Sequence, residues 1–391
     1  MLTRESVQSN NLSSKIAFSP SRYTSPSIDN LIKKQIQDLR DRINNYKVLA
    51  HLRESGAGIS SRDLPDHADI IIFGPTGSGK SSLIRTFYRA LHNTKELGDD
   101  IQEKLSIKQK DENEGTTEFT AVVIKKQTKI DEEYKKNQIR ITTGNQTIND
   151  DEFEEQYRKI RNKGKRSKDT ELSSKIIAHD TRGQIWMDER EMRQLHILIK
   201  GKVKDKTKVE QRNYRYAYLL WEFWKRDQDL FPNTILQKGK SIKRKPHSLI
   251  FVFDGSMDEI PNGEEETKFY KDIIQMARRR KYVYPQIVLT CVDKIEDKLV
   301  EEEELKTGQQ LDFFEKEQKL REIMDYKEEK VVLNLGIQRS SVHFIENYKT
   351  KDEEQKIRID YKALRLLHEC VQQSDSYIQS NIQEKNKCLI F

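Results

Sequence analysis

The chain has 391 residues, of which 35% are hydrophobic and 35% are charged; 71 basic and 64 acidic residues give a formal net charge of +7. This length allows one large domain or two ordinary ones, the high charge predicts polar insertions around a normal core, and the small net charge gives no reason to expect nucleic acid as a partner. The three cysteines lack metal-ligand spacing, which argues against a disulfide framework or a zinc site and favours a reducing, cytoplasmic setting.

The N-terminal segment, residues 1–27, is rich in serine, asparagine and threonine and is predicted to be disordered. It has no apolar stretch typical of a secretion signal. Nowhere does the chain contain an apolar run near the roughly 20 residues that a membrane-spanning helix needs.

A helix is predicted to begin at Ile28, with Ser27 as its cap. Its apolar residues are spaced alternately four and three apart, at Ile32, Ile36, Leu39, Ile43 and Tyr46. Such a seam fits either a helix docked on the protein's own domain or self-association through residues 28–50. The helix and a serine- and glycine-rich linker together occupy 28–64, ahead of a main domain over 65–378.

The stretch Gly74-Pro75-Thr76-Gly77-Ser78-Gly79-Lys80-Ser81 fits the phosphate-binding pattern G-x-x-x-x-G-K-[ST]. An apolar strand, Ile70–Phe73, precedes it, and a helical pattern over Ser82–Leu91 follows. Glycine lets the backbone approach a phosphate chain, and the amides of the helix N-terminus point at the anion. We therefore expect residues 74–82, including Ser82, to bind nucleotide, with Lys80 on the phosphates and Ser81 on Mg²⁺. The alternative is a glycine-rich turn that binds nothing.

A first switch segment is expected at Gly115–Thr120, before a strand over Glu118–Lys126. A threonine hydroxyl there would join the Mg²⁺ shell and contact the reacting phosphate, and Thr117 is favoured slightly over Thr116. The alternative is a strand that simply begins with threonines. A long polar segment, about 128–172, follows as an insertion or loop.

A second phosphate contact is predicted directly after the short apolar strand Ile176–Ala178. Asp180-Thr181-Arg182-Gly183 fits the D-x-x-G pattern of GTPases. Asp180 would hold Mg²⁺ through water and the Gly183 amide would meet the γ-phosphate. Gln184 has the position of a residue that orients the attacking water, although a solvated glutamine would look the same.

Further elements alternate along the rest of the chain. Helices are expected near 186–198, 214–224, 264–282, 296–330 and 361–378, and strands at 248–253, 286–289 and 341–345. This alternation predicts an α/β, P-loop NTPase fold with a doubly wound, mostly parallel sheet, whose ligands bind at the carboxyl ends of the strands.

Base recognition is predicted at the ends of the last two strands. Thr290-Cys291-Val292-Asp293 lies where GTPases carry N-K-x-D, and the Asp293 carboxylate can accept the two neighbouring donors of guanine, which adenine lacks. Asp293 as a helix cap is the alternative. Asn347 belongs to the stretch that ends the last strand, where a backbone amide commonly meets the guanine oxygen.

The tail, 379–391, ends in Cys388-Leu389-Ile390-Phe391, a C-a-a-X pattern that predicts geranylgeranylation of Cys388 after a polar spacer. A frayed apolar end is the alternative. Because one prenyl group anchors only weakly, the basic stretches 158–168 and 238–245 are expected to add contact with an anionic membrane; they fit solvated loops as well.

Taken together, these motifs resemble the interferon-induced protein 44 family of large GTP-binding proteins over roughly residues 65–375. The resemblance rests on the phosphate loop and on Leu198–Lys202, His247–Asp254, Leu289–Asp293 and Ile345–Tyr348. It implies a cytoplasmic G domain of the Ras-like type that binds GTP or GDP with Mg²⁺. The family also places a T-x-V-D type motif where other GTPases have N-K-x-D, and Asp180–Gln184 is closer to the Ras-like pattern.

Three functions remain open from the sequence. The first is a slow, Mg²⁺-dependent GTPase that acts as a membrane-associated switch. The second is a GTP-loaded scaffold that hardly hydrolyses and assembles through its N-terminal helix. The third is an ATP-using P-loop enzyme, against which Asp293 argues.

Overall fold

A computed structural model describes residues 26–50, 64–105, 118–129, 172–185, 187–203, 207–208, 241–282, 284–307, 312–349 and 354–388. Several sequence predictions lie wholly or mostly outside these residues: the N-terminal segment 1–27, the serine- and glycine-rich linker, Thr117 of the first switch, the polar segment 128–172 with the basic stretch 158–168, and the helix near 214–224.

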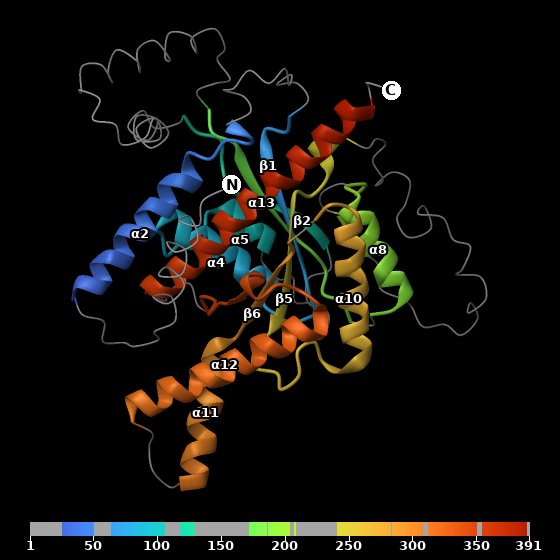
Figure 1. Cartoon of the computed structure of the whole chain (residues 1–391). Coiled ribbons are helices and arrows are strands. Elements are labelled where there is room, and N and C mark those ends of the chain that lie inside the picture. The colour runs from blue at the N-terminus through green and yellow to red at the C-terminus, as the bar shows by residue number, and fades with distance from the viewer. Residues whose placement is uncertain are drawn as a thin grey trace, which may run out of the picture.

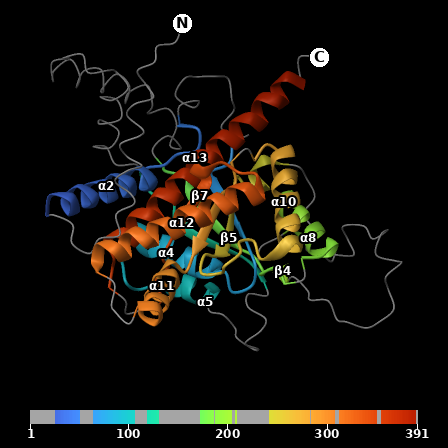
Figure 2. The same cartoon turned by 60° about the horizontal axis from the view of Figure 1, so that its bottom comes forward.

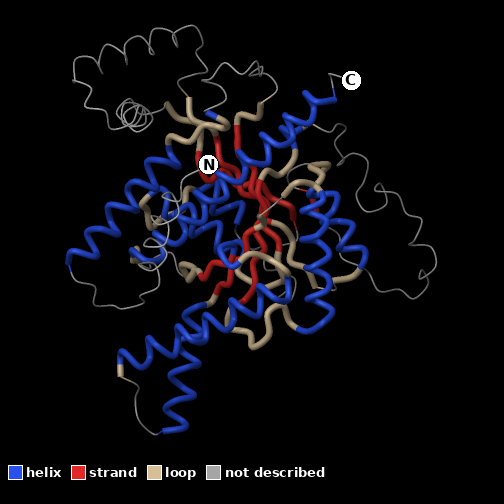
Figure 3. Tube along the Cα trace, in the orientation of Figure 1, coloured by secondary structure: helices blue, strands red, loops and turns tan. Residues whose placement is uncertain are grey.

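A seven-stranded sheet forms the centre of the molecule (Figures 1 and 3), with the strand order β4-β2-β3-β1-β5-β6-β7. The strands are β1 (His67–Phe73), β2 (Glu118–Lys125), β3 (Lys175–Asp180), β4 (Thr207–Lys208), β5 (Ser248–Asp254), β6 (Gln286–Thr290) and β7 (Val342–Phe344). β1, β3, β5, β6 and β7 are parallel, while β2 runs antiparallel to both β3 and β4. The fold is therefore α/β with a mostly parallel sheet, as predicted.

Helices cover both faces of this sheet, which is why its central strands are continuous apolar runs. Along β1, Ile70 and Ile72 pack on one face, whereas Ile71 and Phe73 pack on the other. α8 (Glu189–Ile199), α10 (Gly263–Arg279) and α12 (Phe313–Leu335) contribute to the Ile71 face. α2 (Pro26–Asn44), α4 (Lys80–His92), α5 (Asp99–Leu105) and most of α13 (Ile357–Cys388) cover the other.

α2 lies along α13 on the surface of the main domain (Figures 1 and 2). Its Ile36 and Ile43 are buried in the same core as the apolar side of α4. This arrangement corresponds to the docked alternative for the N-terminal helix. The sequence suggested a division at residue 64. In the structure, α2 from residues before this point packs into the core formed by residues after it.

Two regions differ from the sequence prediction. The charged helical region near 296–330 is a pair of helices, α11 (Val292–Thr307) and α12, which projects from the sheet in Figure 1. The last helix, predicted to end near Ile378 before a polar spacer, continues as α13 to Cys388. Residues 379–388 contain neither glycine nor proline, so nothing local ends the helix. None of the described helices is long and apolar enough to cross a membrane.

A partly buried ionic cluster lies near the start of β1. The Asp69 carboxylate lies 3.0 Å from His67 Nε2 and 3.1 Å from His179 Nε2, and His67 Nδ1 lies 2.7 Å from an oxygen of Asp66. Burial lowers the pKa of His67, but the hydrogen bonds and charges of Asp69 and Asp66 outweigh it and raise the pKa to about 9. His67 therefore carries a charge in the native protein at neutral pH.

His247 lies beside this cluster but is held neutral. Its Nδ1 accepts from the Asp69 amide at 3.0 Å and its Nε2 donates to Ile242 O at 2.9 Å. Burial lowers the pKa of His247 to about 4. The surroundings thus raise the pKa of His67 and lower the pKa of the neighbouring His247.

The two histidines together should stabilise the native state most near pH 6.5. The contribution of His67, at most about 3 kcal/mol, is complete below the ordinary histidine pKa of 6.5 and is lost as pH rises through about 9, because the native state binds the extra proton. The contribution of His247 is complete above 6.5 and is lost as pH falls toward 4, because the unfolded state then binds the extra proton.

Thermal unfolding between pH 4 and pH 9 measures this. His67→Gln should flatten the alkaline side of the profile and leave the acid side. His92→Gln is the control, since the His92 ring faces the backbone carbonyl of Ile124 rather than a carboxylate. An alkaline side unchanged by His67→Gln would contradict the assignment.

Candidate functional site

The parallel strands bring their carboxyl ends to one edge of the sheet, and the loop between β1 and α4 forms the centre of that edge. Gly74, Gly77 and Gly79 have φ angles of 150°, 79° and 90°, which favour glycine. A side chain at Gly74 would also overlap the backbone oxygen of Val252 in β5. The loop adopts a shape that other residues could not, directly before the amino end of α4.

Lys80 folds back over this loop. Its Nζ donates to Gly74 O at 3.0 Å and to Pro75 O at 2.8 Å, and the side chain is buried. Burial lowers the pKa of Lys80 to about 8, opposed by the charge of Asp180. An ammonium has three N–H donors. Two of them bond the loop, which leaves one donor for an anion bound beside residues 74–79.

Asp180, the last residue of β3, meets the start of α4. The Ser81 hydroxyl donates to Asp180 Oδ2 at 2.5 Å, while Asp180 Oδ1 is buried without a hydrogen-bond partner. Burial raises the pKa of Asp180, although Ser81, Lys80 and Arg85 act against the shift. A hydroxyl beside a carboxylate with an unused oxygen is a donor set that suits Mg²⁺.

Gln184 joins the loop after β1 to the segment after β3. Its backbone amide donates to Gly74 O at 3.2 Å, its carbonyl accepts from Thr76 N at 3.1 Å, and its side-chain oxygen accepts from Gly74 N at 2.9 Å. The side-chain amide donates to Arg182 O at 2.8 Å. Both ends of this side chain thus bond protein groups, so Gln184 is not a solvated glutamine, and its role in orienting water stays a prediction.

Further contacts support the same junction. A side chain at Gly183 would overlap the backbone of Thr76, so glycine is needed for this close approach. The Tyr270 hydroxyl of α10 lies 3.3 Å from Gln184 Oε1. Glu191 accepts from the amides of Ile185 and Met187, the latter at 2.8 Å. The segment after β3 is therefore tied to both α8 and α10.

Polar atoms on the loop side of the junction also lack protein partners. Thr76 Oγ1 and Ser78 Oγ are both buried without a hydrogen bond. Ser82 belongs to the first turn of α4, where helical geometry leaves the backbone amides without intrahelical acceptors. These groups, together with Asp180 Oδ1, are what a phosphate chain with its cation would satisfy.

The predicted base-recognition residues lie beside the loop on the β6 side. The Thr290 hydroxyl is buried, 2.8 Å from Ser78 O and 3.1 Å from Phe253 O, and so joins the end of β6 to the loop. Asp293 belongs to the first turn of α11, where its carboxylate forms a 2.5 Å ion pair with Lys349.

Asn347 approaches the same loop from the end of β7. Its amide nitrogen lies 3.5 Å from Gly79 O, and its oxygen accepts from Thr86 Oγ1 of α4 at 3.2 Å. A side chain at Gly79 would come within 3.4 Å of both Asn347 and Thr290. Thr290 and Asn347 thus lie against the loop. Asp293 is connected to this group by its ion pair with Lys349, which follows Asn347 by two residues.

Sequence reasoning missed several contributors. Thr86 and Tyr270 carry no motif, and only the fold reveals their contacts. Lys349 is one lysine in a highly charged chain. Glu191 did carry a signal, because Asp188 and Glu191 have the spacing of a capping box, and Asp188 accepts from the Glu191 amide at 2.9 Å.

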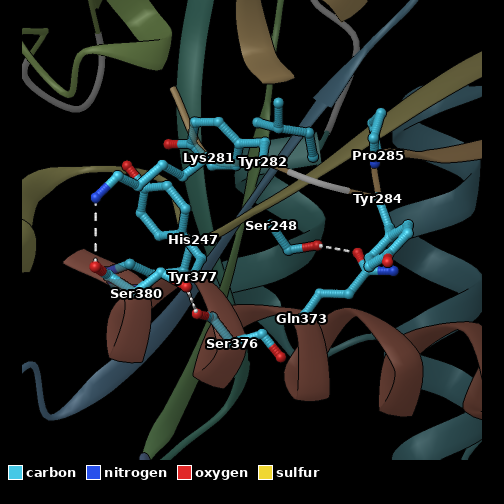
Figure 4. A pocket seen from close by; sticks show the side chains of 11 residues that line it. His247, Ser248, Lys281, Tyr282, Tyr284, Pro285, Gln373, Ser376, Tyr377 and Ser380 are labelled. Carbon is cyan, nitrogen blue, oxygen red and sulfur yellow. Dashed lines mark hydrogen bonds between the residues drawn. The ribbon is translucent and has the colours of Figure 1, made fainter. Parts of the chain in front are cut away.

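A separate small pocket of about 70 Å³, open to solvent, lies at the opposite edge, where β5 and β6 begin (Figure 4). The rings of Tyr282 and Tyr377 stack in its wall with centroids 4.2 Å apart. Its polar groups bond to one another, with Ser248 on Gln373 and Lys281 on Ser380 O, each at 3.3 Å. This pocket contains none of the predicted nucleotide-binding residues.

Comparison with protein-family models finds no match, and comparison with curated proteins finds none either. Among solved structures, the chain is similar to a signal recognition particle receptor from Chaetomium thermophilum, described as an SRb-GTP/SRX complex. The identity is 14%, the match covers 66% of this chain and 89% of the other, and the TM-score is 0.25.

It is also similar to an oligomerised bacterial dynamin pair described as sensing and tethering membranes. Here the identity is 13% with a TM-score of 0.30, and the match covers 94% of this chain but 50% of the other, so the chain spans half the length of that protein. At such TM-scores the strand order and the phosphate loop, rather than these structures, carry the assignment of the fold.

Proposed function

We propose that the protein binds GTP and GDP with Mg²⁺ at the edge of the sheet formed by residues 74–82. The observation that carries the proposal is the position of Lys80, which is buried and held by two loop carbonyls in front of the α4 amides. An anion there would restore the charge that burial disfavours, since an opposite charge raises an ammonium pKa. Ser81 and Asp180 would hold the metal, whose chemistry is to neutralise phosphate charge.

Guanine is the proposed base because Thr290, Asp293 and Asn347 gather around the loop at the ends of β6 and β7. An aspartate carboxylate accepts two neighbouring donors and would favour guanine over adenine. The resemblance to the interferon-induced protein 44 family, which carries a similar T-x-V-D type motif, supports this part of the proposal. An ATP-using enzyme is correspondingly disfavoured.

For hydrolysis we propose a slow rate. Gln184 can orient a water only after it leaves the Gly74 amide and the Tyr270 hydroxyl, and its departure would leave a buried amide without an acceptor. The same contacts favour the second candidate, a GTP-loaded scaffold with little turnover. Thr117 stays a predicted ligand of Mg²⁺ and of the reacting phosphate. Prenylation of Cys388 and the membrane association that it would provide also stay predictions.

Lys80→Ala should lower the affinity for GTP and GDP on the order of 100-fold, because the phosphates lose a charged hydrogen bond. Calorimetry or a fluorescent GDP analogue measures this. Lys95→Ala is the matched control, since Lys95 is an exposed lysine just after the same helix. Equal affinities for Lys80→Ala and the unmutated protein would mean that the loop is structural only.

Asp293→Asn should weaken GTP binding while leaving the phosphate contacts, because an amide cannot accept both guanine donors. The control is Asp297→Asn, which changes an exposed aspartate one turn further along α11. Competition against a fluorescent GDP analogue reads the base preference. ATP competing as well as GTP against the unmutated protein would overturn the guanine assignment.

Gln184→Ala should both weaken GTP binding several-fold and slow single-turnover hydrolysis, because the Gly74 amide loses its acceptor. Tyr270→Phe removes only the hydroxyl and keeps the ring against Phe253, so it should leave binding nearly unchanged. Slower hydrolysis with unaltered GTP affinity and unaltered thermal stability in Gln184→Ala would instead assign Gln184 to the reacting water alone.

A further inference from the structure

Tyr348, in the segment after β7, is held by several parts of the fold. Tyr348 is buried; its hydroxyl donates to Asp360 Oδ1 at 2.8 Å and accepts from the Lys356 amide at 2.9 Å. The Arg89 guanidinium of α4 lies 3.9 Å from the centroid of the Tyr348 ring. The backbone amide of Tyr348 lies 3.3 Å from Thr86 Oγ1. Tyr348 is therefore fixed between α4 and the first turn of α13.

Asp360 is shared between this tyrosine and the N-terminal helix. Its second oxygen accepts from Arg40 Nη2 of α2 at 2.9 Å, and the two side chains are only 13% and 5% exposed. Arg40 Nε also donates to Ala90 O of α4 at 2.8 Å. A buried pair keeps its strength only in good geometry, and removing one partner leaves an uncompensated charge. The position of α2 is thus linked to the bond that holds Tyr348.

Tyr348 lies between two residues of the proposed base site. Asn347 touches the phosphate loop at Gly79 O, and Lys349 pairs with Asp293 at 2.5 Å. Because adjacent residues share a backbone, a shift of Tyr348 moves both of these side chains. A continuous path of contacts therefore leads from Arg40 through Asp360 and Tyr348 to the residues that would surround guanine.

We propose that Arg40, Asp360 and Tyr348 are positioning residues for guanine-nucleotide binding, through which docking of α2 raises the affinity of the base site. The inference rests on the proposed guanine-nucleotide binding of the same site. Coupling between two sites is reciprocal, so bound nucleotide in turn stabilises the docked position of α2. α2 is more than a cover for the core, because its Arg40 bonds Asp360 of α13, whose other oxygen holds Tyr348 after β7.

The test uses the full chain and a fluorescent GDP analogue. Tyr348→Phe keeps the ring under Arg89 and removes only the hydroxyl that bonds Asp360, and Arg40→Ala removes the contact from α2. Both should release GDP faster, on the order of tenfold, while single-turnover hydrolysis of bound GTP keeps its rate. Arg42→Ala, which breaks an exposed pair with Asp38 on the same helix, should behave like the unmutated protein.

Hydrogen exchange of residues 26–44 supplies the reciprocal measurement. GDP should slow exchange in α2 of the unmutated protein but have little effect in Tyr348→Phe, a conservative change that keeps the measurement meaningful if Arg40→Ala fails to fold. Unchanged GDP release in Tyr348→Phe together with nucleotide-independent exchange in α2 would overturn the inference and leave the proposed function intact. An unmutated protein that binds no guanine nucleotide would overturn both.

Discussion

The junction between Gly74 and Gln184 is the interaction on which the candidate site depends. Main-chain and side-chain bonds from one glutamine satisfy Gly74 on both its amide and its carbonyl and also engage Thr76. These groups are buried, where an unmade hydrogen bond costs about 1–3 kcal/mol. β1 and β3 are paired as far as Ile72 and Asp180, and the junction continues this pairing beyond the strand ends, where Ser81 bonds Asp180. The shape of the candidate anion site therefore depends on the segment after β3 as well as on residues 74–81.

Much of this arrangement can be predicted from local patterns in the sequence. The glycines at 74, 77 and 79 indicate a loop with positive φ angles, and the structure has them. The apolar runs of β1 and β5 indicate burial on both faces of a parallel sheet. Asp180 was predicted at the end of its strand and lies there. Such features depend on nearest neighbours and on the alternation of strands, and a single chain is enough to predict them.

Other features depend on contacts between distant segments, which no local pattern encodes. Gln184 fits a catalytic pattern, yet the orientation of its side-chain amide is set by hydrogen bonds from the Gly74 amide and the Tyr270 hydroxyl. The pairing of Lys349 with Asp293 joins the ends of two strands that are separated by the α11–α12 pair. The apolar seam of α2 predicted a partner, but only the fold identifies α13 and α4 as that partner. The extension of α13 to Cys388 reflects the absence of any residue that ends a helix, a weaker signal than a glycine or a proline would be.

The placement of α2 against α13 has a consequence for biosynthesis. Arg40 and Asp360 are 320 positions apart in the chain, and a ribosome adds roughly 5–20 residues per second. α2 therefore leaves the ribosome roughly 15 to 60 seconds before its partner helix exists. During that interval Ile36 and Ile43 have α4 beside them but lack the surface of α13, so the nascent chain keeps part of this apolar stripe exposed. The native core can close only when α13 has been made.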